Sequence, residues 1–355
     1  MRGIRVVRIG ENPRFFRKEL KFEQGRLCRL HLGTIAMLEP SSVTVDPSAL
    51  IEEMGTEQRQ AIMEIQTAVL SSMTRKLSES GFTWVLPVML TKTTDPLWPD
   101  PGASIERRIE VEIYGHRVKT MQSMIIHKRV LASLGPEKFF SLSPNIRIET
   151  RERAKTGRHL YEFTQLEIEI ANGVMGDVFR VFEDLIKSSI AEVKKKLRDS
   201  LEMLRRDLRV PETPFKVYNR KKLEEEYGKS WEKAISEESI NPVWVTDIPR
   251  EFYDYEDETT AEWRNFDLFL PRGYGEVISG AEREYEYTKL LRKIERDGLN
   301  RDDYGLLLRL AKDGRLKPSA GAGLGIERFI SYMCGTDHVA EVQPFPRIPG
   351  AVPDL

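Results

Sequence analysis

Residues 144–171 read PNIRIETRERAKTGRHLYEFTQLEIEIA, and this stretch decides the predicted fold. Within it, IRIET and LYEFTQLEIEIA alternate apolar and polar side chains, and the polar segment RERAKTGRH separates them. Such alternation is typical of β-strands, because successive side chains of a strand point to opposite faces of the sheet. The stretch therefore predicts two strands joined by a polar loop, each strand with one polar face.

The polar side of this predicted strand pair is rich in charge. It comprises the following side chains of the two strands and their loop: Arg147, Glu149, Arg158, His159, Phe163, Gln165, Glu167 and Glu169. Arginines and carboxylates are costly to bury unless something pairs with them, so this face indicates a ligand site. A solvated face is the alternative, because antiparallel sheets often have one wet face. Three later side chains favour the ligand site, two carboxylates across a hairpin and an arginine on a helix that follows glycines: Asp267, Glu276 and Arg328.

The rest of the chain predicts hairpins with helices between them. Apolar side chains at spacings of three and four predict a helix over residues 57–80 and a longer one over 176–206. FTWVLPVML predicts a strand, NFDLFLP and YGEVISG predict a hairpin, and residues 282–296 are expected to be helical. Because the strands follow one another as hairpins, we predict an α+β fold with a largely antiparallel sheet flanked by helices. Residues 1–52 are predicted to form a short N-terminal appendage, in which IRVVRI and RLCRLHLGTIAML could be strands.

Composition and charge exclude several classes of protein. The chain has 355 residues and a net charge of −1, which does not favour a general nucleic-acid binder. Its first 40 residues hold nine Lys or Arg and four Glu, so this arm is either a solvated segment or an RNA-contacting arm. No apolar run approaches the ~18 residues of a membrane-spanning helix. The only cysteines, Cys28 and Cys334, exclude a disulfide scaffold and fit a reducing, cytoplasmic setting.

Two familiar phosphate-binding motifs are incomplete. Gly228-Lys229-Ser230 resembles the end of a P-loop, but Leu223 stands where the first glycine should be. Gly321, Gly323 and Gly325 suggest a dinucleotide fingerprint, but no acidic residue closes a βαβ unit after them. A nucleotide would therefore have to be held by charged side chains on a sheet.

Three segments carry a family resemblance. Residues 144–171 resemble motif 2 of the class II aminoacyl-tRNA synthetases, and AGAGLGIERFISYMCGTDHVAEVQPFPR resembles motif 3. The predicted helix over 57–80, followed by GFTWVLPVML, resembles motif 1, the dimer helix of that class, and so implies a C2 homodimer. RHLYEFTQLEIE, GEVISGAERE and EVQPFPR resemble the aspartyl, asparaginyl and lysyl subgroup. The resemblance implies a catalytic domain over residues 53–355.

The resemblance also implies a role for each matching side chain. The implied ATP-binding residues are Arg147, Glu149, Arg158, His159, Phe163 and Arg328. The implied ligands of Mg²⁺, which prefers oxygen donors, are Asp267 and Glu276. Lys128 and Arg283 are expected to read a distal carboxylate of the amino acid, and its ammonium is expected near Gln122, Ser123, Gln165 and Glu167. The residues expected to act directly in catalysis are Arg147, Glu276 and Arg328.

Departures from the tRNA ligases shape the predicted reaction. Only a short segment precedes the motif 1 helix, and Ile125 replaces the second glutamine of the usual Gln-Ser-Pro-Gln stretch. With PLWPDP, IPREFYD and VQPFPRIPG, the chain resembles the archaeal asparagine synthetases related to asparaginyl-tRNA synthetase. That resemblance implies ATP-dependent synthesis of asparagine from aspartate and ammonia through a β-aspartyl-adenylate, releasing AMP and pyrophosphate. Its cofactors would be ATP and Mg²⁺, and tRNA would be an unlikely partner.

Two other functions stay open at this point. The alternative enzyme is an aspartyl- or asparaginyl-tRNA ligase, or a tRNA-modifying paralogue, and the basic arm is its best support. The last possibility is a non-catalytic regulator, against which Arg147, Glu276 and Arg328 all count.

Overall fold

The computed structural model describes residues 21–23, 26–28, 45–97 and 105–354. The chain divides into two units, residues 1–42 and 43–355, and each is described by itself. In the first unit, β1 (Lys21–Glu23) pairs antiparallel with β2 (Arg26–Cys28). β2 lies within the predicted strand RLCRLHLGTIAML, whereas IRVVRI and most of the predicted appendage lie outside the described residues. The proposed boundary between residues 52 and 53 stays a prediction.

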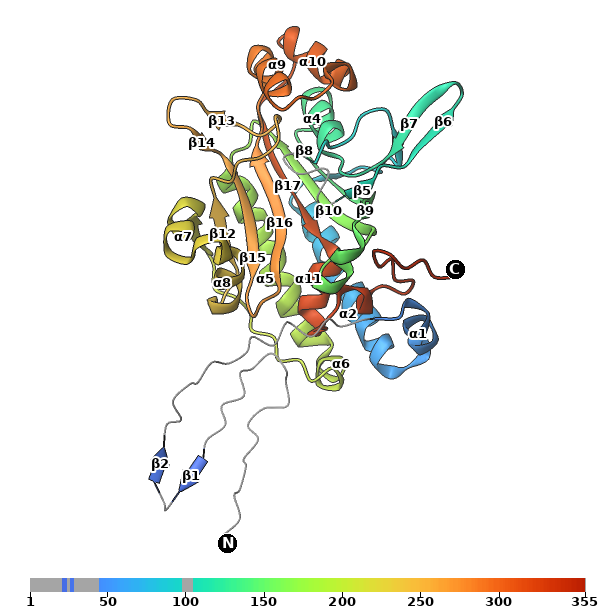
Figure 1. Cartoon of the computed structure of the whole chain (residues 1–355), viewed down its shortest axis with the longest axis vertical. Helices are drawn as coiled ribbons and strands as arrows, with labels where there is room; N and C mark the ends of the chain where they lie inside the picture. The colour runs from blue at the N-terminus through green and yellow to red at the C-terminus, as the bar shows by residue number, and fades with distance from the viewer. Residues whose placement is uncertain (1–20, 24–25, 29–44, 98–104, 355) are drawn as a thin grey trace. The chain divides into compact units, whose positions relative to one another are not determined.

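An eight-stranded sheet forms the centre of the second unit (Figure 1). Its strands, in spatial order, are β11 (Lys216–Asn219), β12 (Val243–Thr246), β15 (Asn265–Leu270), β16 (Gly275–Glu282), β17 (Ser319–Gly325), β10 (Glu162–Ala171), β8 (Lys138–Ile146) and β3 (Thr83–Trp84). The pairs are antiparallel except at the two edges, where β11 runs parallel to β12 and β3 runs parallel to β8. The predicted α+β fold is thereby confirmed.

One face of the sheet is covered by two long helices, α2 (Glu57–Glu79) and α5 (Met175–Lys196). The apolar stripe of α2 packs with Leu166 and Ile168 of β10 in the main core. The helix predicted over 57–80 is thus confirmed. The helix predicted over 176–206 is wrong in one respect, because it breaks at Leu197 into α5 and α6 (Arg198–Met203). The apolar residues keep a helical spacing across the break, so the sequence does not reveal it.

Smaller elements surround the sheet. The further helices are α1 (Pro47–Glu52), α4 (Ile125–Leu134), α7 (Arg220–Tyr227), α8 (Trp231–Glu238), α9 (Tyr287–Arg296), α10 (Gly305–Lys312) and α11 (Ile326–Cys334), with the short helices η1 (Glu53–Gly55), η2 (Arg151–Thr156), η3 (Gly228–Ser230), η4 (Arg301–Tyr304) and η5 (Val339–Val342). The further strands are β4 (Leu90–Thr91), β5 (Ile105–Arg107), β6 (Glu110–Ile113), β7 (His116–Thr120), β9 (Ile148–Glu149), β13 (Glu256–Asp257) and β14 (Glu262–Trp263). Helices α4, α9 and α10 form a second core cluster at one end of the sheet.

Two predicted elements need correction. FTWVLPVML is not one strand: only Thr83–Trp84 and Leu90–Thr91 pair, and Pro87, which has no N–H to donate, lies between them. The helix expected from residue 282 begins at Tyr287, because pairing with β17 keeps the chain extended to Glu282.

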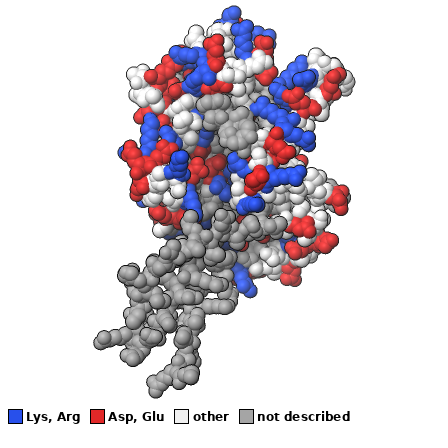
Figure 2. Space-filling view, viewed as in Figure 1, with Lys and Arg blue, Asp and Glu red and all other residues white. Residues whose placement is uncertain are grey.

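The surface carries both signs of charge. Lys and Arg are interspersed with Asp and Glu over the face drawn in Figure 2. In the part of the chain that the structure describes, no helix is long and apolar enough to cross a membrane.

Candidate active site

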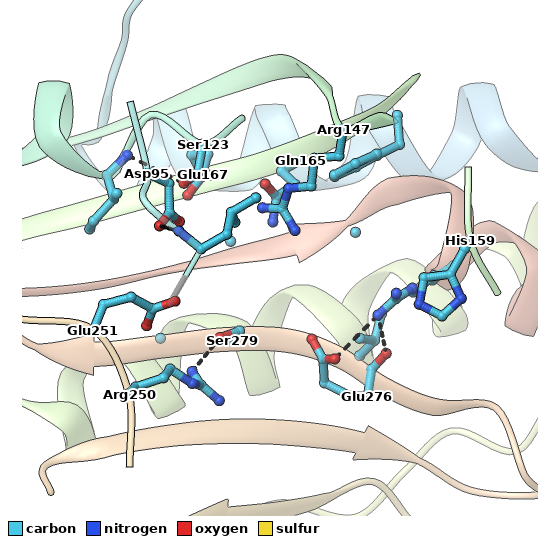
Figure 3. A pocket seen from close by; sticks show the side chains of 18 of the residues that line it. Asp95, Ser123, Arg147, His159, Gln165, Glu167, Arg250, Glu251, Glu276 and Ser279 are labelled. Carbon is cyan, nitrogen blue, oxygen red and sulfur yellow. Dashed lines mark hydrogen bonds and ion pairs between the residues drawn. The ribbon is translucent and has the colours of Figure 1, made fainter. Parts of the chain in front are cut away.

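The face of the sheet opposite α2 and α5 bears a cavity of about 310 Å³. Its position follows from the period of β10: Leu166 and Ile168 enter the core, whereas Gln165 and Glu167 line the cavity. The predicted site residues that line it are Ser123, Lys128, Arg147, Glu149, Arg158, His159, Phe163, Gln165, Glu167, Glu276, Arg283 and Arg328. Gln122 and Asp267 do not line it, and each instead contacts an arginine that does. The structure therefore brings the predicted residues into one place (Figure 3).

Arg147 lies at a break that the sequence does not show. The strand predicted over IRIET is not continuous: β8 ends at Ile146, and the chain resumes after Arg147 as β9, which pairs with β5. The Arg147 Nε atom donates to the main-chain oxygen of Gln122 at 3.0 Å, and its guanidinium carbon lies 5.2 Å from the centroid of the Phe163 ring. These contacts fix the guanidinium beside an aromatic ring at the cavity wall.

A second arginine cluster marks one end of the cavity. The Arg328 Nη1 atom lies 3.3 Å from Glu276 Oε2, and Arg328 Nε donates to the main-chain oxygen of Arg158 at 3.1 Å. Burial by itself would raise the pKa of Glu276, but the charges of Arg328 and Arg158 outweigh it and hold that pKa below its ordinary value. We call these three residues the arginine end of the cavity, and its two cations suit an anionic ligand.

His159 is a neutral member of the same region. Burial lowers the pKa of His159 to about 2, and the charge of Arg328 acts in the same direction. Its two ring nitrogens lie 2.9 Å from Arg153 Nη1 and 2.6 Å from Thr156 Oγ1. The side chain therefore stays uncharged at neutral pH and acts as a hydrogen-bonding group in this loop.

Asp267 and Glu276 sit on the paired strands β15 and β16. Asp267 Oδ2 accepts from Arg250 Nη2 at 2.5 Å, whereas its buried Oδ1 has no hydrogen-bond partner among the described residues. Burial raises the pKa of Asp267 to about 6 despite the charge of Arg250. Among residues 45–97 and 105–354 no group of three His, Cys, Asp or Glu could hold a metal alone. The free Asp267 oxygen therefore fits a magnesium ion that takes its other ligands from phosphate and water.

The opposite end of the cavity contains buried ion pairs. Lys128 Nζ lies 2.5 Å from Glu167 Oε2 and 3.6 Å from Glu169 Oε2. Arg283 lies 3.3 Å from Glu169 and 2.9 Å from Asp254. The two cations predicted to read a distal carboxylate are thus already paired with carboxylates of the protein. We call this region, with Asp95, Ser123 and Glu251, the amino-acid end.

Three residues that line this region have no role predicted from the sequence: Arg250, Glu251 and Asp254. They follow β12 in the irregular segment IPREFYD, so no strand or helix period marks them. The one feature of the sequence that could have pointed to them is that these three charged residues flank two aromatic residues, Phe252 and Tyr253. Both aromatic side chains are buried in the structure. An isolated antiparallel β-bridge between the main chains of Asp254 and Arg283 holds Asp254 at the site.

An antiparallel sheet that holds motif arginines over such a cavity defines the catalytic core of a class II aminoacyl-tRNA synthetase. A family model described as "tRNA synthetases class II (D, K and N)" matches residues 50–349, and the chain belongs to this family.

Several named relatives share most of this chain. It is 29% identical to the asparagine–tRNA ligase of Pyrococcus furiosus over 83% of this chain and 70% of the relative. It is 31% identical to the asparagine–tRNA ligase of Koribacter versatilis over 82% of this chain and 69% of the relative. The crystal structure of Pyrococcus horikoshii asparaginyl-tRNA synthetase complexed with asparaginyl-adenylate superposes with a TM-score of 0.77 at 27% identity. That match covers 86% of this chain and 73% of the other.

These relatives correct the predicted reaction. Because they are asparagine–tRNA ligases, the prediction of an asparagine synthetase that uses aspartate and ammonia is wrong, and so is the expectation that tRNA is an unlikely partner. Ile125 and the short segment before the motif 1 helix did not discriminate between the two families. The archaeal source and the homodimer stay predictions.

Proposed function

We propose that this chain is an aminoacyl-tRNA ligase, which activates an amino acid with ATP and transfers it to tRNA. The observation that carries the proposal is that Arg147 of motif 2 and Arg328 of motif 3 line the same cavity, in a chain similar to asparagine–tRNA ligases. Asparagine, which the names of these relatives give, is the first amino acid to test.

The first step needs charge neutralisation more than proton transfer. A carboxylate oxygen of the amino acid attacks the α-phosphorus of ATP, the bond to the β-phosphate oxygen breaks, and pyrophosphate leaves. Arg147 would hold the α-phosphate and the attacking carboxylate, and the arginine end would receive the leaving phosphates. Fixed cations aimed at developing negative charge lower the barrier of such a reaction. Phe163 and Arg328 would enclose the adenine, with Glu149 near its amine.

The proposed magnesium ion would be held by Asp267 and Glu276. When bound, it neutralises phosphate charge and orients the nucleotide. In the second step a ribose hydroxyl of tRNA attacks the carbonyl of the aminoacyl group, and AMP leaves.

Pyrophosphate exchange tests the first step directly. With ATP, Mg²⁺ and the full chain, we expect exchange that depends on an added amino acid, and charging of tRNA with the same amino acid. We expect aspartate to be a poorer substrate than asparagine, because Lys128 and Arg283 are already paired with carboxylates. The amino acids to be tested are the twenty protein amino acids and two non-protein amino acids with a side-chain ammonium, 2,4-diaminobutyrate and ornithine. If none of them supports exchange, the proposal is contradicted. Exchange without any charging of tRNA would contradict it as well.

A further inference from the structure

The amino-acid end and the wall behind it hold more carboxylates than cations. The carboxylates are Asp95, Glu167, Glu169, Glu251, Asp254, Asp267 and Glu284, and the cations are Lys128, Arg129, Arg250, Arg283 and Lys293. All of them are buried except Arg250, whose side chain is 16% exposed. In the part of the chain that the structure describes, seven carboxylates therefore lie with five cations in a region where unpaired charge is costly.

Most of these cations are committed to a carboxylate partner. Arg250 is paired with Asp267, and Lys293 lies 3.3 Å from Glu284. Lys128 is paired with Glu167, and Arg283 is paired with Glu169 and Asp254. Arg129 donates to the main-chain oxygen of Glu284 at 2.8 Å and lies behind the cavity wall. The two carboxylates that form no ion pair with a described residue are Asp95 and Glu251, and the cation whose charge acts on Glu251 is Arg250, which is already paired with Asp267.

Glu251 is the residue that points to a ligand. Its exposed fraction is 8% and it lines the cavity. Among the described residues its carboxylate accepts only from its own main-chain N–H and forms no ion pair. Among the described residues, Asp95, with an exposed fraction of 6%, accepts only from the main-chain N–H of Leu97, at 2.9 Å. Figure 3 shows Asp95 and Glu251 at the same end of the cavity, carried by separate chain segments. Burial and the neighbouring charge of Asp95 raise the pKa of Glu251 well above its ordinary value.

We propose that the amino-acid end binds an amino acid with a second positive charge, a primary ammonium group on its side chain. This inference rests on the proposed function and names the substrate class of the same site. The α-ammonium accounts for Asp95, and the side-chain ammonium accounts for Glu251, the second carboxylate without an ion-pair partner. Asparagine brings one positive charge and leaves a buried carboxylate without a partner, and aspartate adds a further negative charge. Charge-assisted hydrogen bonds from the ammonium to these carboxylates are the strong kind.

The first experiment measures pyrophosphate exchange by the full chain with a series of amino acids. The series comprises 2,4-diaminobutyrate, ornithine and lysine, their uncharged counterpart norleucine, and asparagine and aspartate. We expect at least one diamino acid to give a kcat/KM about 10- to 100-fold above that of asparagine, with no exchange from norleucine. Exchange with asparagine and with no diamino acid would overturn the inference and leave the proposed function standing.

The second experiment removes the charge of Glu251 and keeps its shape. For Glu251→Gln we expect kcat/KM for the preferred diamino acid to fall about 10- to 100-fold, mainly through KM, while that for asparagine does not fall. Glu251→Asp should recover part of the loss, and Glu79→Gln, at an exposed position at the end of α2, should change neither value. An equal loss for both substrates would show a structural role for Glu251 and overturn the inference.

If no pyrophosphate exchange occurs, a measurement of amino-acid binding distinguishes failure of the proposed ligase function from failure of the proposed ammonium subsite. Thermal unfolding of the full chain is followed with each diamino acid and with asparagine. A rise in Tm with a diamino acid that Glu251→Gln abolishes would support the cation subsite while the proposed function fails. Without such a rise, both proposals fail.

Discussion

Replacing Arg147 with alanine is expected to lower the rate of amino-acid-dependent pyrophosphate exchange by about 100- to 1,000-fold. Negative charge passes from the α-phosphate to pyrophosphate as the adenylate forms, and Arg147 is the arginine held beside Phe163. Its anchor on the Gln122 oxygen fixes the guanidinium before substrate arrives, so the effect should fall on kcat. Steady-state exchange kinetics with saturating ATP measure it.

Two control variants make the result for Arg147 specific. Arg147→Lys keeps the charge but loses the planar fork, so we expect it to recover only part of the rate. Arg198→Ala, at a side chain that is 82% exposed on α6, should leave the rate unchanged. An Arg147→Ala variant that is folded and turns over at the rate of the unmodified chain would refute the proposed role in catalysis.

Replacing Glu169 with alanine is expected to lower the free energy of unfolding by about 3–5 kcal/mol. Glu169 is fully buried, accepts from Ser319 at 2.8 Å, and is the shared partner of Arg283 and Lys128. Removing it leaves two buried cations with less compensating charge. Urea unfolding followed by circular dichroism and by tryptophan fluorescence measures the change, provided that the two transitions coincide.

The control for Glu169 is an exposed ion pair. Glu202→Ala removes the partner of Arg198 on α6 and should change the free energy of unfolding by less than about 1 kcal/mol. Burial by itself would raise the pKa of Glu169, but Arg283 and Lys128 outweigh it, so its pKa in the folded chain lies below the ordinary value. Its contribution is therefore present above the ordinary glutamate pKa of 4.5 and is lost as pH falls through the lower pKa of the folded chain. A Glu169→Ala variant as stable as Glu202→Ala would contradict the account of this network.

The sequence was sufficient wherever one regular element carried the information. The period of two in LYEFTQLEIEIA placed Leu166 and Ile168 in the core and Gln165 and Glu167 on the cavity face, as the structure shows. The apolar stripe of α2 was equally explicit. The same local patterns carried the family resemblance, because the motif residues lie on or beside these elements. They did not identify the reaction, since the side chains proposed to bind ATP are compatible with more than one acceptor of the activated amino acid.

Only the tertiary structure decided the charges at the amino-acid end. Lys128 meets Glu167 and Glu169, and Arg283 meets Asp254, although these residues come from α4, β10 and segments beside β16 and β13. The electrostatic energy of a charged side chain depends on its distance to other charges, and the sequence does not give these distances. From the sequence alone, Lys128 and Arg283 were therefore predicted to bind a substrate carboxylate. Asp95 and Glu251 lie in irregular segments, where no period predicts direction. Their approach to one cavity follows from packing between distant parts of the chain, and that packing sets which charges a ligand must supply.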